Sequence, residues 1–175
     1  MLRIVLIGAE STGKSTLTKA LASYFNAPFS CEFARDYVTR HQTAVTKEDL
    51  EEIIQGQLAY ESNACTKTST LVFHDTNLLS TSIYAQYYFR YFPESLQIAL
   101  SLNQYDLYLF CGDDIPWIAE PLQRDSLPAQ KQIQNLINKA LIEDKLPFIK
   151  VKGTLDDRIQ KSIIAVEKLL SSTKN

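Results

Sequence analysis

The fold of this chain is decided by Gly8-Ala9-Glu10-Ser11-Thr12-Gly13-Lys14-Ser15, a stretch that we call the phosphate loop. It satisfies the pattern G-x-x-x-x-G-K-[ST] at every required position. An almost continuous apolar run, Leu2 to Ile7, precedes it and predicts a strand buried on both faces. The residues behind it predict a helix with one apolar face, formed by Leu17, Ala20, Leu21, Tyr24 and Phe25. A strand, this loop and a helix in that order predict a nucleotide-binding site.

The residue types of the phosphate loop suit a polyphosphate. Gly8 and Gly13 let the backbone turn tightly and approach the phosphates without a Cβ in the way. Successive backbone N–H groups then form an anion nest, and the dipole of the following helix adds partial positive charge. Lys14 reaches the β- and γ-phosphates, and the Ser15 hydroxyl binds Mg²⁺. We therefore predict a nucleoside triphosphate and Mg²⁺ as cofactors, with the nucleotide-binding residues Gly8, Glu10, Ser11, Thr12, Gly13, Lys14, Ser15 and Thr16.

Length and composition predict a single domain that spans residues 1–175, and with its phosphate loop we expect it to be P-loop kinase-like. The net charge is −2 and no basic stripe is present, which argues against a nucleic-acid partner. No apolar run reaches the length of a membrane span, and the chain enters its first strand without a signal peptide. The cysteines are scattered and odd in number, which is typical of a reduced, cytoplasmic protein. Association into a homo-oligomer stays open.

Apolar strands and amphipathic helices alternate along the chain. After the first strand, further strands are predicted at Phe29–Cys31, Leu71–Phe73, Leu107–Phe110 and Phe148–Val151. Further helices are predicted after the capping pattern Thr46 with Asp49, over 78–92 up to Pro93, from Pro128, and after Thr154 with Asp157. This alternation predicts an α/β P-loop NTPase fold of the nucleoside- and nucleotide-kinase kind, a five-stranded parallel sheet with helices on both faces. The strand order 2-3-1-4-5 is adopted from P-loop kinases.

Charged residues follow two of the predicted strands. Asp75 closes the strand that starts at Leu71, and it is predicted to hold Mg²⁺, directly or through water, or to take a proton from an attacking hydroxyl. The alternative is a helix N-cap. Glu32 and Arg35 follow the strand at Phe29, where a carboxylate can accept sugar hydroxyls and an Arg can hold an anion; a surface ion pair is the alternative. The predicted acceptor-binding residues are Glu32, Arg35 and Asp75, and the predicted metal ligands are Ser15 and Asp75.

The stretch from Gly112 to Pro128 contains three prolines and four carboxylates and has no sustained period. Such a stretch inside a compact domain is often an active-site lid. Arg124 is its only cation, so it is predicted to close over the transferring phosphate as an arginine finger in cis, with a solvated loop Arg as the alternative. Trp117 either stacks on a base or anchors the loop by packing. The predicted catalytic residues are Lys14, Asp75 and Arg124.

Several of these stretches resemble one family, the ribosylnicotinamide kinase domains of the NadR type. The phosphate loop, with Glu at its third position, is similar to that of the family. Glu32-Phe33-Ala34-Arg35-Asp36-Tyr37 resembles its E-[YF]-x-R-[DE]-[YF] segment. Asp75-Thr76-Asn77 followed by Ser80-Thr81 resembles its D-T-[DN]-x-x-[ST]-T stretch. Parts of the region from Tyr105 to Ser126 resemble its strand and lid.

The resemblance implies ATP-dependent phosphorylation of the 5′-hydroxyl of a riboside, nicotinamide riboside in the best-known members, and hence NAD biosynthesis. It also implies that Glu32 and Arg35 line the acceptor site, that Asp75 is the catalytic or metal-organising carboxylate, and that Arg124 is the lid Arg.

The sequence departs from the family pattern in three places. Cys31 stands where bifunctional members carry a Trp suited to stacking on nicotinamide. Pro121-Leu122-Gln123-Arg124 has one residue more between Leu and Arg than the family's G-L-R. The H-x-G-H-type motif of the adenylyltransferase domain is absent, so we expect only the kinase half.

We therefore expect a P-loop phosphotransferase, an ATP-dependent kinase with a small-molecule riboside as its acceptor. The alternative is a nucleotide-dependent regulatory ATPase or binding module without a small-molecule acceptor. Release of ADP that is stimulated by an acceptor separates the two. A GTPase-like protein is disfavoured, because no glycine follows Asp75 at the third position, where the switch pattern has one.

Overall fold

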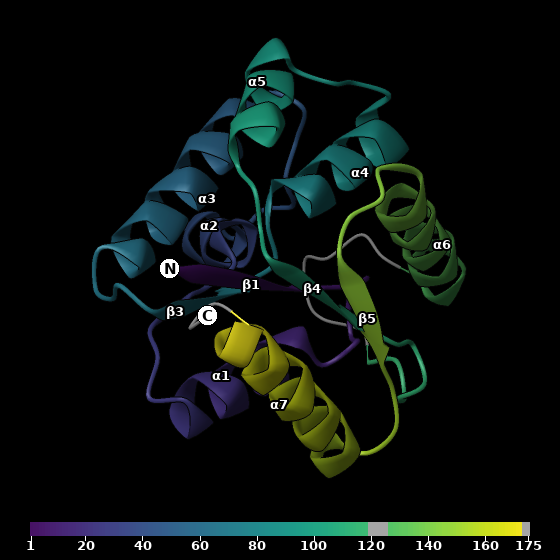
Figure 1. Cartoon of the computed structure of the whole chain (residues 1–175). Coiled ribbons are helices and arrows are strands. Elements are labelled where there is room, and N and C mark those ends of the chain that lie inside the picture. Colours follow the sequence, from purple (N-terminus) through teal and green to yellow (C-terminus); the bar gives the residue numbers. More distant parts are fainter. Residues whose placement is uncertain (119–125, 173–175) are drawn as a thin grey trace.

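The computed structural model describes residues 1–118 and 126–172, and a five-stranded sheet forms its centre (Figure 1). All neighbouring strands are parallel, and their order is β2-β3-β1-β4-β5. The strands are β1 (Leu2–Ile7), β2 (Phe29–Ser30), β3 (Leu71–Asp75), β4 (Leu107–Cys111) and β5 (Phe148–Val151). The predicted α/β P-loop fold and its strand order are therefore confirmed.

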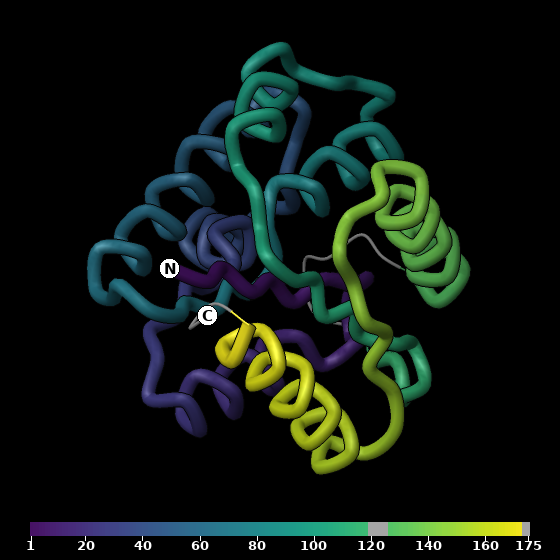
Figure 2. Tube along the Cα trace, viewed as in Figure 1, coloured from purple at the N-terminus to yellow at the C-terminus, as the bar shows by residue number. Residues whose placement is uncertain are grey.

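Helices cover both faces of the sheet, as Figures 1 and 2 show. One face carries two helices that pack on each other, α1 (Lys14–Tyr24) and α7 (Leu155–Ser172). The other face carries α3 (Leu50–Cys65), α4 (Leu78–Phe89), α5 (Glu94–Leu102) and α6 (Leu127–Glu143). The short helix α2 (Phe33–His41) packs on α3. Within the described residues, none of the helices combines the length and the apolar character that crossing a membrane requires.

β1 lies between two apolar layers, as its apolar run predicted. Leu2, Ile4 and Leu6 belong to the core beneath α1 and α7. Val5 and Ile7 belong to the core beneath α4 and α6. Successive side chains of a strand point to opposite faces, so this alternation buries the strand on both sides. The carboxyl end of β1, where the phosphate loop begins, is thereby fixed in place.

Parallel pairing brings the ends of three strands to one edge of the sheet. Leu6 of β1 pairs with Asp75 of β3, and Ile7 pairs with Phe110 of β4. The Thr76 N–H continues the first ladder by donating to the Leu6 carbonyl oxygen at 3.0 Å. Ligands of open α/β sheets bind outside the carboxyl ends of the strands. The phosphate loop and Asp75 therefore lie at the edge where a ligand is expected.

The structure contains two helices that the sequence pattern did not predict, α2 and α5. The helix predicted over 78–92 ends earlier, at Phe89, because Arg90 adopts a left-handed conformation with a φ of 52°. Pro93 then takes the N-cap position of α5, so it begins a helix as well as ending one. Tyr24 was predicted on the inward face of α1 but is 58% exposed. α1 ends at Tyr24, and the Tyr24 ring lies edge-on against the Phe25 ring.

Both capping patterns read from the sequence are present, but only one lies at a helix start. In front of α7, the Asp157 N–H donates to the Thr154 hydroxyl oxygen at 3.2 Å, and the Thr154 N–H donates to Asp157 Oδ2 at 2.9 Å. This is a capping box. Thr46 and Asp49 also bond, with 2.8 Å from the Thr46 N–H to Asp49 Oδ2, but α3 begins only after Asp49.

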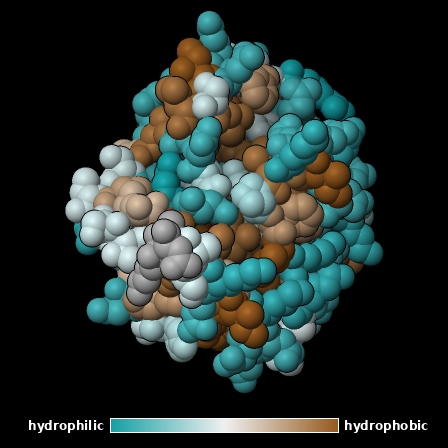
Figure 3. All heavy atoms as spheres, in the orientation of Figure 1, coloured by the Kyte–Doolittle hydropathy of each residue, from teal (hydrophilic) through white to brown (hydrophobic). Residues whose placement is uncertain are grey.

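The outer surface mixes both kinds of side chain. Figure 3 shows hydrophilic residues over much of one face, with apolar residues gathered around α5 at the top of the view. The exposed apolar residues of that region are Tyr91, Phe92, Ile98 and Leu102. Scattered apolar side chains are normal on globular surfaces, so they do not mark a site by themselves.

α2 approaches α3 closely at Gly56. A Cβ at Gly56 would collide with the buried ring of Phe33. We predict that Gly56→Ala lowers the free energy of unfolding by about 1–2 kcal/mol, because overpacking outweighs a gain of roughly 1 kcal/mol in helix propensity. Urea denaturation measures this change. Ser62→Ala, on the exposed side of the same helix, is the matched control and should be close to neutral. A Gly56→Ala variant as stable as the wild type would contradict the close contact.

Candidate active site at the phosphate loop

The phosphate loop requires glycine at two positions. At Gly8, a Cβ would lie 2.8 Å from the Thr12 hydroxyl oxygen and 2.9 Å from the Cys111 carbonyl oxygen, so a larger residue would force the loop away from β4. Gly13 has a φ of 78° and is the N-cap of α1. Ser11 also adopts a positive φ, of 53°. The loop thus curls around the amino-terminal end of α1, where backbone amides and the helix dipole favour an anion.

Lys14 begins α1, and its side chain folds back over the loop. The residue is only 7% exposed, and its Nζ donates to the Ala9 carbonyl oxygen at 2.9 Å. The Thr12 hydroxyl donates to the same oxygen at 2.7 Å. The ammonium group is therefore held within the loop by a neutral carbonyl. A phosphate oxygen is a better partner for an ammonium ion than a carbonyl oxygen is, so a bound polyphosphate would take its place.

Two buried glutamines of α6 hold the phosphate loop from outside. Gln134 accepts from the Ala9 N–H at 2.8 Å, and its amide donates to the Cys111 carbonyl oxygen at 2.7 Å. Gln130, one turn earlier, donates to the Glu10 carbonyl oxygen at 2.7 Å. Because both side chains are buried, losing either partner would leave polar groups unpaired away from water. The two glutamines therefore fix the backbone of the loop.

α7 holds the loop through Arg158, which is 3% exposed. Its Nη1 donates to the Thr12 carbonyl oxygen at 2.8 Å, and its Nη2 donates to the Gly112 carbonyl oxygen at 3.2 Å and to Asp114 Oδ1 at 2.8 Å. Its Nε donates to the Gly153 carbonyl oxygen at 3.0 Å. Desolvation raises the pKa of Asp114, but the Gly153 N–H and the guanidinium of Arg158 outweigh it and lower that pKa. One guanidinium thus joins the phosphate loop to the segments that follow β4 and β5.

Sequence reasoning missed these three residues, although a signal was present. Gln130 and Gln134 are spaced by one helical turn, next to the inward residues Ile133 and Ile137. Arg158 precedes the inward residue Ile159. A polar residue on the buried face of an amphipathic helix needs a hydrogen-bond partner, and the partner here is loop backbone.

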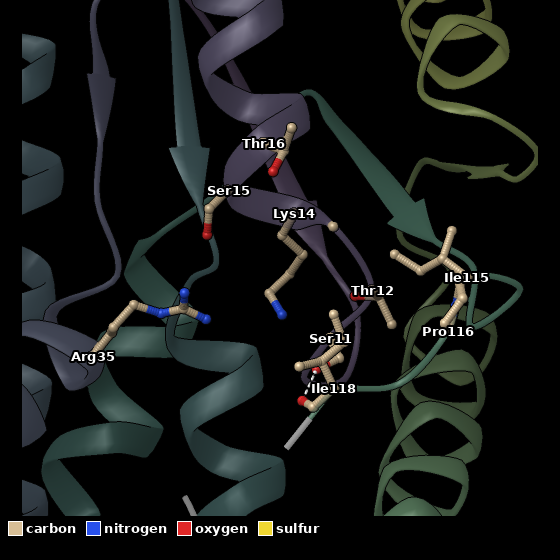
Figure 4. A pocket seen from close by; sticks show the side chains of 10 residues that line it. Ser11, Thr12, Lys14, Ser15, Thr16, Arg35, Ile115, Pro116 and Ile118 are labelled. Atoms are coloured by element: carbon tan, nitrogen blue, oxygen red, sulfur yellow. Dashed lines mark hydrogen bonds between the residues drawn. The ribbon is translucent and has the colours of Figure 1, made fainter. Parts of the chain in front are cut away.

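A cavity of about 270 Å³ opens beside the phosphate loop (Figure 4). It is lined by Ser11–Thr16, by Arg35 of α2, and by Ile115, Pro116 and Ile118. The Ser11 hydroxyl donates to the Ile118 carbonyl oxygen at 2.7 Å, which joins the segment after β4 to the loop. Figure 4 shows the Lys14 amine and the Arg35 guanidinium directed into the same space from different elements. Lys14 and the loop amides make the part of this cavity next to the loop a candidate site for a polyphosphate, and Arg35 faces that part from α2.

Glu32 and Arg35 form the ion pair that their spacing allowed, with 3.7 Å between Arg35 Nε and Glu32 Oε2. Both side chains are partly exposed, so the pair adds little stability. Arg35 in addition lines the cavity, whereas Glu32, the N-cap residue of α2, is not among its lining residues. The structure thus brings Arg35 to the phosphate loop, and the acceptor role of the two residues stays a prediction.

Asp75 ends β3 in a strained, buried setting. The residue is 5% exposed, and its Oδ1 has no hydrogen-bond partner among the described residues. The N-cap of α4 is Asn77, so Asp75 does not cap that helix. Thr76 has a φ of 67°, which is unfavourable for a β-branched residue. Unpaired buried polar atoms and backbone strain concentrate at functional sites, which makes the end of β3 a candidate site.

The residues present fit a Mg²⁺ ion that is held together with a nucleotide. Within residues 1–118 and 126–172, no group of three or more His, Cys, Asp or Glu side chains could hold a metal by itself. Mg²⁺ in phosphate-loop sites needs no such group, because one or two protein oxygens, phosphates and waters complete its shell. α1, which carries Ser15, packs against β3, which carries the unpaired Oδ1 of Asp75. Ser15 and Asp75 stay the predicted donors for such an ion.

Asp75 contributes to raised pKa values of two cysteine thiols, Cys31 and Cys111. Partial burial and the carboxylates of Asp36 and Asp75 raise the pKa of the Cys31 thiol. Full burial raises the pKa of Cys111 to about 12. Both thiols are therefore neutral near pH 7. The residue before Glu32 is thus a small uncharged thiol within the field of two carboxylates.

The predicted lid at 112–128 is described only in part. Its first part, through Ile118, is irregular and contributes three residues to the cavity, and its last residues belong to α6. Arg124 lies outside the described residues, so its role as the lid cation stays a prediction. Trp117 is partly buried, and its neighbours in the sequence, Pro116 and Ile118, line the cavity. Its role also stays a prediction.

A parallel sheet in this strand order, with a phosphate loop between β1 and α1 and a buried lysine beside an anion cavity, defines a P-loop nucleotide-binding domain. Residues 3–158 match the model of a protein family described as an AAA domain, and the chain belongs to that family.

Curated relatives refine this assignment. The chain is 27% identical over 177 residues to the trifunctional NAD biosynthesis/regulator protein NadR of Escherichia coli (strain K12), a match that covers 98% of this chain and 43% of that protein. NadR of Salmonella typhimurium (strain LT2) is 28% identical over 173 residues, which cover 95% of this chain and 42% of that protein. The chain thus spans less than half the length of the curated relatives it matches.

Solved structures agree with the sequence relatives. The NadR protein in complex with NR aligns with a TM-score of 0.75 at 25% identity, over 95% of this chain and 51% of that chain. Deoxyadenosine kinase from M. mycoides with bound dATP aligns over 95% of this chain and 100% of that chain, with a TM-score of 0.64 at 11% identity, which shows the fold alone. The predicted resemblance is confirmed: the chain is a NadR-like P-loop domain with the fold of nucleoside and nucleotide kinases.

Gln134 provides a direct test of how the loop is held. We predict that Gln134→Leu weakens the binding of a magnesium-bound ATP analogue by about tenfold, because the Ala9 N–H and the Cys111 carbonyl lose their buried partner. Titration calorimetry measures the affinity, and circular dichroism establishes that the variant is folded. Asn135→Leu, at the exposed neighbouring position of α6, is the control and should bind like the wild type. Unchanged affinity of folded Gln134→Leu protein would show that the loop does not depend on this side chain.

Proposed function

We propose that this chain is an ATP-dependent small-molecule kinase that phosphorylates the 5′-hydroxyl of a riboside. The observation that carries the proposal is the shared cavity of Lys14 and Arg35, beside a strand that ends in the buried carboxylate of Asp75. A cation that reaches the cavity from α2, outside the phosphate loop, suits a second substrate next to the nucleotide. The kinase fold of the structural neighbours supports a phosphotransferase.

The proposed reaction depends on positioning and charge stabilisation, without a covalent intermediate. The loop amides and Lys14 hold the β- and γ-phosphates of ATP. Ser15 and Asp75 would hold Mg²⁺, Asp75 directly or through water, and the ion would neutralise phosphate charge. Asp75 orients the acceptor hydroxyl and takes its proton while the oxygen attacks the γ-phosphorus and the bond to the departing ADP breaks. Arg124 is the cation that the lid would contribute.

Nicotinamide riboside is our first candidate for the acceptor. A NadR relative has been solved in complex with NR, which we take to be this riboside. Its nicotinamide ring carries a positive charge. Glu32 pairs with Arg35, which lines the cavity, and the Asp36 and Asp75 carboxylates both raise the pKa of the neighbouring Cys31 thiol. A cationic ring suits this group of carboxylates, and the small Cys31 leaves room for it.

Incubation with magnesium ATP and a panel of ribosides tests the proposal. The panel contains nicotinamide riboside, adenosine, uridine and cytidine, and mass spectrometry should detect the gain of one phosphate on at least one of them. Release of ADP should rise when that riboside is added. If ATP is bound or hydrolysed but no riboside is phosphorylated or stimulates ADP release, the proposal is wrong and the regulatory ATPase is favoured.

Substitution of Lys14 tests whether its ammonium group takes part in phosphate transfer. We predict that Lys14→Ala reduces the rate of phosphate transfer by roughly 10²- to 10³-fold, because the ammonium that stabilises the transferring phosphate is lost. Steady-state release of ADP measures the rate. Lys19→Ala removes an exposed lysine from the same helix and should retain the wild-type rate. Equal rates for Lys14→Ala and the wild type would exclude phosphate-loop catalysis.

A further inference from the structure

The first turn of α2 is capped by a residue from another helix. Glu32 is the N-cap of α2, but its side chain makes no capping hydrogen bond. Instead, the Phe33 N–H donates to Gln57 Oε1 of α3 at 3.0 Å, in a buried position. The first amides of a helix have no partner within the helix and are usually bonded by the N-cap side chain. Gln57 bonds the first amide of α2 from the neighbouring helix α3. The Glu32 carboxylate lies toward Arg35, with 3.7 Å between Glu32 Oε2 and Arg35 Nε.

Gln57 is itself held in one orientation. Its Nε2 donates to Glu61 Oε1 at 3.2 Å, one turn further along α3. Glu61 is 2% exposed, and its Oε2 accepts from the Tyr105 hydroxyl at 2.7 Å and from Arg3 Nη2 at 2.8 Å. Since Glu61 offers an acceptor and the Phe33 N–H a donor, the Gln57 amide can satisfy both in only one orientation. The cap of α2 is thereby tied to β1 and to the residues in front of β4.

Further contacts hold the body of α2 against α3, but none of them fixes its first amide. The Phe33 ring rests on Gly56, and the Tyr60 hydroxyl donates to Asp36 Oδ2 at 2.9 Å. These contacts set the distance between the two helices. The Gln57 bond reaches the amide at which α2 begins, and Arg35, which lines the cavity, lies in the same first turn.

We propose that Gln57 is a positioning residue for the acceptor, acting through the first turn of α2 on Glu32 and Arg35. This inference rests on the proposed riboside kinase activity. Among the described residues, Gln57 is not part of the cavity lining, and its hydrogen bonds go to Phe33 and Glu61. Its effect therefore falls on the acceptor half of the site and leaves the nucleotide half unchanged.

Kinetics of Gln57→Leu test the inference. The KM for the riboside should rise by about tenfold, the effect of one lost buried hydrogen-bond partner, while the KM for ATP stays within about twofold of the wild type. Amides in the first turn of α2 should exchange with solvent faster, and those of the phosphate loop should not. Gln55→Leu, on the exposed side of α3, is the matched control and should behave like the wild type.

Two further substitutions keep the inference testable if Gln57→Leu fails to fold. Gln57→Glu keeps an oxygen for the Phe33 N–H but sets two carboxylates side by side, so it should raise the riboside KM. Adding Glu61→Gln restores a donor and acceptor pair and should return the KM toward the wild-type value. Equal changes in both KM values, or no change in either, would overturn the inference. A wild-type protein that phosphorylates no riboside would instead refute the proposed function, and the exchange of the α2 amides would still report whether Gln57 caps the helix.

Discussion

The site depends on side chains outside the phosphate loop that hold the backbone of this loop in one conformation. A loop whose amides bind phosphate cannot use those amides for regular secondary structure, so its shape must come from other contacts. Gln130, Gln134 and Arg158 provide them by bonding the Glu10 carbonyl oxygen, the Ala9 N–H and the Thr12 carbonyl oxygen of the phosphate loop, respectively. All three side chains are buried, where a hydrogen bond is stronger and an unpaired group more costly than in water. These three side chains therefore hold the nest in shape.

The proposed acceptor side depends on the same kind of contact. α2 is short, carries many charged residues and would not be stable alone in water. It gains its place by docking on α3, through the Phe33 ring at Gly56 and the Gln57 amide at the Phe33 N–H. In both halves of the site, a polar side chain on the buried face of a helix fixes the backbone of a neighbouring segment. Rigid placement of this kind is what phosphate transfer between two bound substrates requires.

Local signals in the sequence predicted the elements around the nucleotide well. β1, the phosphate loop and α1 are contiguous, and each has a pattern that needs no distant residue to be recognised. α2 was missed because its helical state depends on α3, and the extent of α4 was overestimated because Arg90 ends it ahead of Pro93. Asp75 was open to two interpretations, and the capping one is excluded because Asn77 occupies the N-cap. Tyr24 followed the helical period and still lies outside, because the period does not say where α1 ends.

The sequence alone determined the class of the protein, because a phosphate loop between an apolar strand and an amphipathic helix is a local arrangement of backbone and charge. It also determined which residue types could serve the chemistry. Only the tertiary structure decided that Arg35 shares a cavity with Lys14, and that residues beyond position 129 hold the loop in shape. These contacts join segments separated by most of the chain. Their formation depends on the parallel pairing and layering of the whole sheet, which no local pattern encodes.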